Sequence, residues 1–146
     1  MSVTENKARA IALFPKAWNE GDFSVVDKYI DTDIIDHFDH SQGIESFKHV
    51  VNMFRTAFPD IHLTVEDEIA QEDRVVHRWT MVGTQQGEIM GIPPTGKEIT
   101  WTGITIVRFA EGKIVERWAN VDLLSVLQQL GVISMPNQTT GAVTTN

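Results

Sequence analysis

The hydrophobic pattern of this chain changes its period near the middle, and this change restricts the possible folds more than any other feature. Before Pro59 apolar side chains recur at helical spacing, most clearly in the stretch from Gly43 to Phe58. After Pro59 they alternate with polar ones, as in half-buried strands. The alternating segments are Ile61–Ile69, Arg74–Thr84, Glu98–Phe109 and Lys113–Val121. Helices followed by an antiparallel meander predict an α+β fold, with the helices covering one face of a curved sheet.

The end of the pattern predicts where the domain ends. Asp122 precedes an apolar run over residues 123–130, which predicts a terminal helix that Gly131 closes. We therefore expect a single domain over residues 1–131. Residues 132–146 are uncharged and rich in threonine, which is typical of a C-terminal tail.

The composition excludes several classes of function. A formal net charge of −8, from 12 basic and 20 acidic residues, argues against nucleic acid or an anionic membrane as the main partner, because both require a basic surface. The chain has no cysteine, so thiol chemistry, disulfides and zinc–thiolate sites are excluded. It also lacks an apolar run of about 18 residues and a signal-peptide core at the start, so we expect a cytoplasmic protein.

The residues from Glu116 to Asp122 carry the most chemical information. Alternation puts Glu116, Trp118, Asn120 and Asp122 on one face of a strand. If that face points into the space between sheet and helices, Asp122 is a carboxylate held away from water, which can exchange protons with a carbon acid near neutral pH. The alternative is structural, because an aspartate directly before a helix is typical of an N-cap. The spacing alone favours the cap.

Four further side chains are candidates for the same pocket. Trp79 and Trp101 lie on the apolar faces of their strands, where a core position is the more common outcome. His77 shares the face of Trp79 and is either a core histidine or a pocket residue. Asp67 has the inward parity in its strand, which makes it a second candidate carboxylate.

Of the five histidines only His37 and His40 are close in sequence, and the run from Asp36 to His40 that contains them could supply metal ligands. It contains two aspartates and two histidines, but nothing elsewhere completes a ligand set. A polar loop is therefore favoured over a metal site. Phosphate-loop and dinucleotide fingerprints are absent, so we expect neither a metal nor a cofactor.

An ordered set of short motifs gives the chain a family resemblance. The motifs are Asn19-Glu20-Gly21-Asp22, Asp36-His37, Phe58-Pro59-Asp60, Gly83-Thr84-Gln85-Gln86-Gly87, Gly91-Ile92-Pro93-Pro94-Thr95-Gly96-Lys97, Gly112-Lys113-Ile114-Val115-Glu116-Arg117-Trp118, and Asp122 followed by Gln128-Gln129-Leu130-Gly131. Each is weak alone, but the ordered set is specific. Over roughly residues 5–131 it resembles the SnoaL-like polyketide cyclases, also called the ester cyclase family, within the nuclear transport factor 2 superfamily.

The resemblance implies a cone-shaped barrel with a pocket inside a curved, mixed or antiparallel sheet, and chemistry without a cofactor. Characterised members close a ring of an aromatic polyketide by intramolecular aldol condensation. The family's acid–base aspartate corresponds to Asp122, and its pocket histidine corresponds to His37. The substrate-binding candidates are Gln85, Asn120, Trp118, Trp101, Trp79 and His77. The family often has histidine where this chain has Gln85, and glutamine cannot accept a proton near neutral pH.

Two kinds of function are consistent with the residues and the resemblance, one catalytic and one not. The first is a cofactor-independent cyclase that acts on a polyketide-like small molecule. The second is a non-catalytic protein of the same fold that binds a hydrophobic small molecule. An epoxide hydrolase is less favoured, because Arg78 is followed two residues later by Thr80 and not by a carboxylate. We also expect a homodimer or higher homo-oligomer in which a second copy covers the apolar residues of the outer sheet face, Val82, Ile104 and Ile106.

Overall fold

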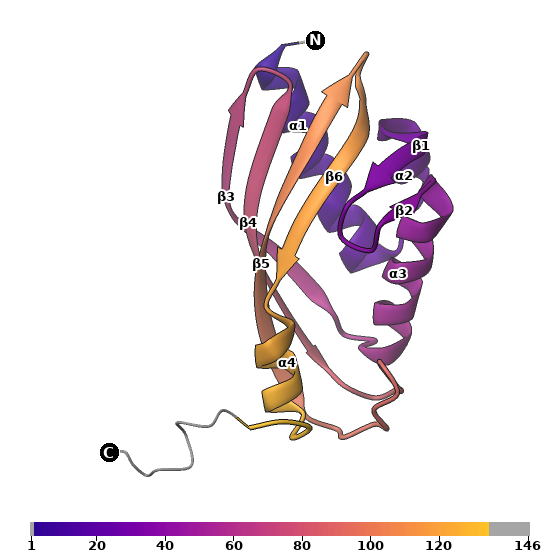
Figure 1. Ribbon diagram of the computed structural model, residues 1–146, viewed down its shortest axis with the longest axis vertical. Coiled ribbons are helices and arrows are strands. Elements are labelled where there is room, and N and C mark those ends of the chain that lie inside the picture. Colours follow the sequence, from indigo (N-terminus) through magenta and orange to yellow (C-terminus); the bar gives the residue numbers. More distant parts are fainter. Residues whose placement is uncertain (1, 135–146) are drawn as a thin grey trace, which may run out of the picture.

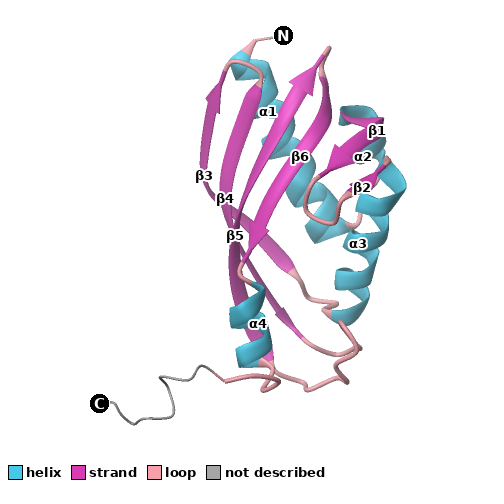
Figure 2. Ribbon diagram, in the orientation of Figure 1, coloured by secondary structure: helices cyan, strands magenta, loops and turns pink. Residues whose placement is uncertain are grey.

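The structure has two layers, a group of helices that come mainly from the first half of the sequence and a curved sheet whose four long strands come from the second half (Figures 1 and 2). The computed structural model describes residues 2–134. The helices are α1 (Val3–Pro15), η1 (Lys16–Glu20), α2 (Ser24–Tyr29), α3 (Ile44–Ala57) and α4 (Leu123–Gln129). The strands are β1 (Ile30–Asp36), β2 (Ser41–Gln42), β3 (His62–Gln71), β4 (Arg74–Thr84), β5 (Glu98–Ala110) and β6 (Lys113–Val121). The expected α+β class is confirmed, whereas most of the expected tail lies outside the described residues.

The sheet has six strands in the order β2–β1–β6–β5–β4–β3. The four long strands β3 to β6 form the antiparallel meander that the alternation predicts. The short strand β1 lies beside β6 and runs parallel to it, so the sheet as a whole is mixed. In Figure 1, α4 follows β6 at the lower end of the sheet, where the long strands end.

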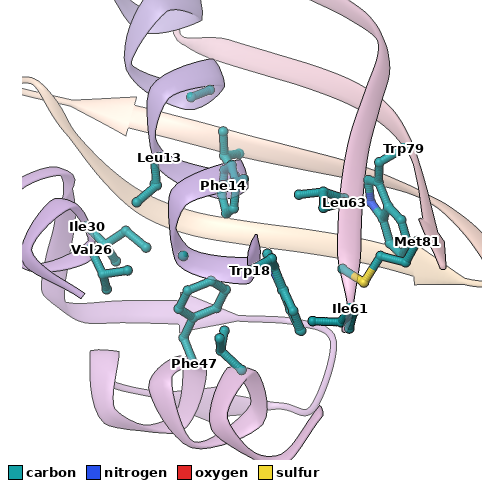
Figure 3. Packing of buried hydrophobic residues seen from close by; sticks show 14 of the residues in the cluster. Leu13, Phe14, Trp18, Val26, Ile30, Phe47, Ile61, Leu63, Trp79 and Met81 are labelled. Atoms are coloured by element: carbon teal, nitrogen blue, oxygen red, sulfur yellow. The ribbon is translucent and has the colours of Figure 1, made fainter. Parts of the chain in front are cut away.

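The first helix starts and stops at signals present in the sequence. Ser2 and Glu5 form a capping box, in which the Ser2 hydroxyl accepts from the Glu5 amide and the Glu5 carboxylate accepts from the Ser2 amide. The α-helix ends at Pro15 and continues as a π-helical turn, η1. Gly21 ends that turn with a φ of 67°, a conformation that favours glycine. Phe14 near the end of α1 and Trp18 in η1 are both buried and point toward the sheet (Figure 3).

Side chains from the helices fill the concave face of the sheet. Figure 3 shows Phe14, Trp18 and Phe47 from the helical layer opposite Leu63 and Trp79 of the sheet. All five are at least 90% buried. The rings of Trp18 and Phe47 meet edge to face with centroids 6.4 Å apart, as aromatic pairs prefer.

Two β-bulges reverse the inward and outward faces of the strands that contain them. In β3, Val65 pairs with Trp79 but Asp67 pairs with Arg78, so Glu66 is one residue extra. In β6, Ile114 pairs with the buried Phe109, whereas Glu116 pairs with Arg108, so that one residue is again extra. Beyond each bulge, the residues that simple alternation places inward face outward.

None of the helices in residues 2–134 is long and apolar enough to cross a membrane.

Candidate functional site

A cavity lies between the concave face of the sheet and the helical layer. The space in which a water-sized molecule can be centred is about 50 Å³, and the void reaches about 690 Å³ when the open solvent at its mouth is included. Aromatic side chains form a large part of its walls. They are Phe14, Trp18, Phe38, Phe47, Phe54, Trp79 and Trp101, which come from α1, η1, α3, β4, β5 and the turn between β1 and β2. Flat, apolar molecules are the ligands that such walls favour.

A band of polar side chains crosses this otherwise apolar wall. It runs across the sheet from Asp36 on β1, through Arg117 on β6 and Thr105 on β5, to His77 on β4. All four residues are at least 91% buried. The Thr105 hydroxyl accepts a hydrogen bond of 2.9 Å from the indole N–H of Trp79. The cavity therefore has both apolar walls and a small number of polar groups, as small-molecule sites commonly do.

Asp36 and Arg117 form a buried ion pair in this band. Arg117 Nη1 donates to Asp36 Oδ2 at 2.8 Å, and Asp36 Oδ1 accepts from the amide of Phe38 at 3.0 Å. The Arg117 guanidinium also lies over the ring of Phe47, 5.4 Å from its centroid. Two opposite charges that share a buried site largely neutralise one another, so Asp36 is not a free base in this arrangement.

His77 is the second distinctive member of the band. Burial, with a smaller contribution from the charge of Arg117, lowers the pKa of His77 from 6.5 to about 4. The imidazole is therefore neutral at pH 7 and offers one N–H donor and one acceptor. Its Nδ1 and the Nε of Arg117 are both buried without a hydrogen-bond partner.

Three of the sequence candidates line the cavity, namely Trp79, Trp101 and His77. Their inward position follows from unbroken alternation in β4 and β5, where no bulge interrupts the register between the two strands. Trp118 and Asn120 instead lie along shallow depressions outside this cavity. The face that carries Glu116, Trp118, Asn120 and Asp122 does not point into the cavity. The bulge in β6 turns Arg117 and Val121 inward instead.

Asp122 caps α4 and is exposed. Its Oδ1 accepts a hydrogen bond of 3.0 Å from the amide of Ser125, which is the structural alternative that the sequence offered. Its two neighbours in sequence, Val121 and Leu123, both line the cavity. The backbone of Asp122 therefore passes the cavity rim, while its carboxylate points elsewhere.

His37 lies outside the cavity, next to the outward-facing part of β6. Its ring stacks on Trp118 with centroids 5.0 Å apart, and its Nε2 lies 2.7 Å from Oε2 of Glu116. Hydrogen bonds from His37 and Arg108 hold the pKa of Glu116 below its usual value. The structure thus brings His37, Trp118 and Glu116 together, but separates them from the cavity.

Gln85 is fully buried and holds the connection between β4 and β5. Its Nε2 is 3.1 Å from each of three backbone carbonyls, those of Gly87, Ile92 and Pro93. Its Oε1 accepts from the amide and the hydroxyl of Thr95, at 3.0 and 2.7 Å. Every polar group of the side chain is thus engaged in shaping the loop, and Gln85 does not line the cavity.

The remaining acidic candidates are also separated from the cavity or already paired. Because of the bulge in β3, Asp67 faces outward and accepts from Arg78 at 2.7 Å, so its predicted inward parity is wrong. Glu68 takes the inward face next to His77, and burial raises the pKa of its carboxyl. Within residues 2–134, no three histidine or acidic side chains gather in a way that could hold a metal ion.

Sequence reasoning missed three members of the polar band: Asp36 as an ion-pair partner, Thr105 and Arg117. Asp36 and Arg117 lie in two of the motifs, but their pairing depends on a parallel contact between β1 and β6. Thr105 follows from alternation in β5 and was identifiable in principle. Arg117 was not, because the sequence carries no clear signal for the bulge that turns it inward.

Comparison with known proteins finds relatives over most of the chain. Residues 8–130 match the family model of the SnoaL-like polyketide cyclase. The chain is 27% identical over 111 residues to the aklanonic acid methyl ester cyclase DauD of Streptomyces sp. strain C5, covering 73% of this chain and 67% of that protein. It is 27% identical over 120 residues to the nogalonic acid methyl ester cyclase of Streptomyces nogalater, covering 79% and 90% of the two chains.

Solved structures share the fold over nearly the whole chain. AclR from Streptomyces galilaeus, a candidate hydroxylase, is 34% identical with a TM-score of 0.82, and the match covers 91% of this chain and 100% of AclR. TsrD from Streptomyces laurentii is 27% identical with a TM-score of 0.84, covering 91% and 99%. With the family model matching residues 8–130, the chain belongs to the SnoaL-like polyketide cyclase family.

Proposed function

We propose that this protein binds a flat, polyketide-like molecule in its aromatic cavity and closes a ring in it by an intramolecular aldol reaction. The observation that carries the proposal is the composition of the cavity, in which tryptophan and phenylalanine walls surround one band of polar groups. The relatives named above as methyl ester cyclases support the reaction class. Their named compounds, aklanonic acid methyl ester and nogalonic acid methyl ester, are the first substrates to test.

The reaction needs one group that moves a proton twice. A base removes a proton from the carbon next to one carbonyl, and the resulting enolate carbon attacks a second carbonyl of the same molecule. The alkoxide oxygen then receives a proton, so the step is redox-neutral. We assign this role to Asp122, which the family resemblance indicates and whose flanking residues Val121 and Leu123 line the cavity.

Asp122 can reach the cavity only if its carboxylate leaves the amide of Ser125. Losing an N-cap hydrogen bond costs about 1 kcal/mol, so bound substrate can compensate for this loss. The proposal thus includes a rotation of the Asp122 side chain from the start of α4 toward the cavity mouth when substrate binds.

The observed cap also favours a second candidate, a non-catalytic binding protein. The two carboxylates in the cavity wall already accept hydrogen bonds, Asp36 from Arg117 and Asp39 from the amide of Ser41. If Asp122 remains at the helix terminus, both carboxylates that line the cavity within residues 2–134 accept at least one hydrogen bond. Such a protein would bind an apolar small molecule and release it unchanged.

Two variants of Asp122 separate the cap from the proton transfer. Asparagine caps helices as well as aspartate but takes no proton, whereas alanine does neither. We expect Asp122→Asn to unfold like the wild type and to lose at least about 100-fold in turnover of the two methyl esters. Asp122→Ala should lose the same activity and about 1 kcal/mol of stability as well.

The outcomes discriminate between the two candidates. Full turnover in Asp122→Asn would show that Asp122 is not the acid–base group. Tight binding of both methyl esters without any product, in the wild type as in Asp122→Asn, would support the binding protein instead. Chromatography of the reaction mixture and calorimetric titration measure the two quantities.

A further inference from the structure

The polar band of the cavity contains two nitrogens that the fold leaves without a hydrogen-bond partner, Nε of Arg117 and Nδ1 of His77. Arg117 is 9% exposed and His77 is 3% exposed. Buried polar groups in native proteins are nearly always hydrogen-bonded, since leaving one unpaired costs about 1–3 kcal/mol. Two such groups in the wall of one cavity therefore require an explanation.

We infer that Arg117 and His77 form an oxygen-binding subsite, which accepts a carbonyl oxygen on the ring system of the bound ligand. This inference rests on the proposed function, because it uses the same cavity. The Arg117 guanidinium can donate from Nε while Nη1 continues to bind Asp36. The neutral imidazole of His77 supplies a second N–H in the tautomer that protonates Nδ1.

The charges around the subsite favour a neutral carbonyl over a carboxylate. The carboxylate of Asp36 already balances the positive charge of Arg117. On the other side of the band, Glu68 lies opposite His77 in the register of β3 and β4, and burial raises the pKa of the Glu68 carboxyl. A ligand carboxylate would thus enter next to Asp36, whereas a ketone or quinone oxygen adds no charge to the buried site.

The rings of Phe14 and Phe47 cover the subsite. Phe14 lies 4.8 Å from the ring of His77, and Phe47 lies 5.4 Å from the guanidinium carbon of Arg117. Because both nitrogens are shielded from solvent, a ligand must displace part of this cover to reach them. It then forms hydrogen bonds for which no water competes.

The subsite is too far from Asp122 to act on the same carbonyl. Asp122 lies five positions after Arg117, just beyond the end of β6, which corresponds to about 16 Å of extended strand. The subsite therefore anchors the far end of an elongated ligand, while ring closure takes place at the mouth. Arg117 and His77 are positioning and specificity residues for a flat molecule that carries a carbonyl on a ring remote from the reacting carbons.

The test compares 1-tetralone with tetralin, the matched bicyclic hydrocarbon that lacks the carbonyl. Calorimetric titration gives the two affinities, and infrared spectroscopy of 1-tetralone labelled with ¹³C at the carbonyl reports hydrogen bonding directly. We expect the wild type to bind 1-tetralone about tenfold tighter than tetralin, as one hydrogen bond to a charged donor predicts, and to lower the carbonyl stretching frequency.

Variants remove the donor without removing the cavity. Arg117→Met leaves Asp36 buried and unpaired, so the double variant Asp36→Asn with Arg117→Met is made alongside it. Both should lose the tenfold preference and the frequency shift while binding tetralin as before. Arg108→Met is the matched control, because Arg108 also pairs with a carboxylate, that of Glu116, but does not line the cavity.

Each outcome bears on a different claim. A frequency shift that survives in both Arg117 variants, or equal wild-type affinity for the two bicyclic compounds, overturns the subsite and leaves the proposed function standing. If the wild type binds neither compound, the aromatic cavity does not take flat ligands, and the proposed function fails together with the subsite. Loss of the preference in Arg108→Met as well would assign it to overall charge and overturn the subsite.

Discussion

Replacing Gln85 with alanine tests whether this residue shapes a loop or binds a ligand. The side chain is fully buried, and its amide hydrogens and oxygen are all used within the connection between β4 and β5. The structure therefore predicts that the substitution affects folding stability first. A substrate-binding residue would instead affect ligand affinity and leave stability unchanged.

The magnitude follows from the hydrogen bonds. The two amide hydrogens serve the carbonyls of Gly87, Ile92 and Pro93, and the oxygen accepts from two groups of Thr95. One hydrogen bond for each of the two amide hydrogens and two for the oxygen make four. At about 1 kcal/mol each, they predict a loss of about 4 kcal/mol. For a domain of this size that corresponds to a fall in Tm of about 10 °C.

The assay is urea denaturation followed by tryptophan fluorescence, with Gln86→Ala as the matched control. Gln86 is the next residue and is exposed, so its loss should change the free energy of unfolding by less than about 0.5 kcal/mol. Gln85→His, which introduces the residue common in the family, keeps one donor and one acceptor and should lose about half as much as alanine.

Equal stability of Gln85→Ala and Gln86→Ala would refute this reasoning. So would a variant that is stable but no longer binds 1-tetralone, because it would return Gln85 to the ligand. Amide hydrogen exchange localises the effect: in Gln85→Ala the amides of Thr95 and Gly96, which bond to the side chain and the backbone of Gln85, should exchange faster.

Three further predictions concern the sheet. A Cβ at Gly103 would overlap with Cζ2 of Trp79, so Gly103→Ala should lower the free energy of unfolding by about 1–3 kcal/mol and change tryptophan fluorescence; an unchanged urea midpoint would contradict the packing. The folded pKa of His77 is about 4 against an ordinary 6.5, so the unfolded chain binds the proton first and stability should fall by up to about 3 kcal/mol between pH 6.5 and 4. His77→Gln should flatten that part of the pH profile, and an unaltered profile would exclude His77 as its cause. Ile104 is 48% exposed on the outer face, and we expect light scattering to give a dimer mass that Ile104→Lys reduces to a monomer; a monomeric wild type would refute this.

The sequence by itself determined the order of helices and long strands, and the family. The amphipathic stripe of α3 and the alternation in β4 and β5 are local patterns, and each formed the predicted element. Trp79 and Trp101 reached the cavity because no bulge interrupts their two strands. Where period and register agree along a whole strand, the inward face can be predicted from the sequence.

Only the tertiary structure decided which face of β3 and of β6 points inward. One extra residue in each strand moves Asp67 and Ile69 outward in β3, and turns Arg117 rather than Trp118 toward the cavity in β6. A side-chain period of two makes every later residue depend on that single insertion. Whether a bulge forms depends on the pairing with the neighbouring strand, on which a pattern within one strand carries no information. For this reason the fold could be predicted from the sequence, and the polar band of the cavity could not.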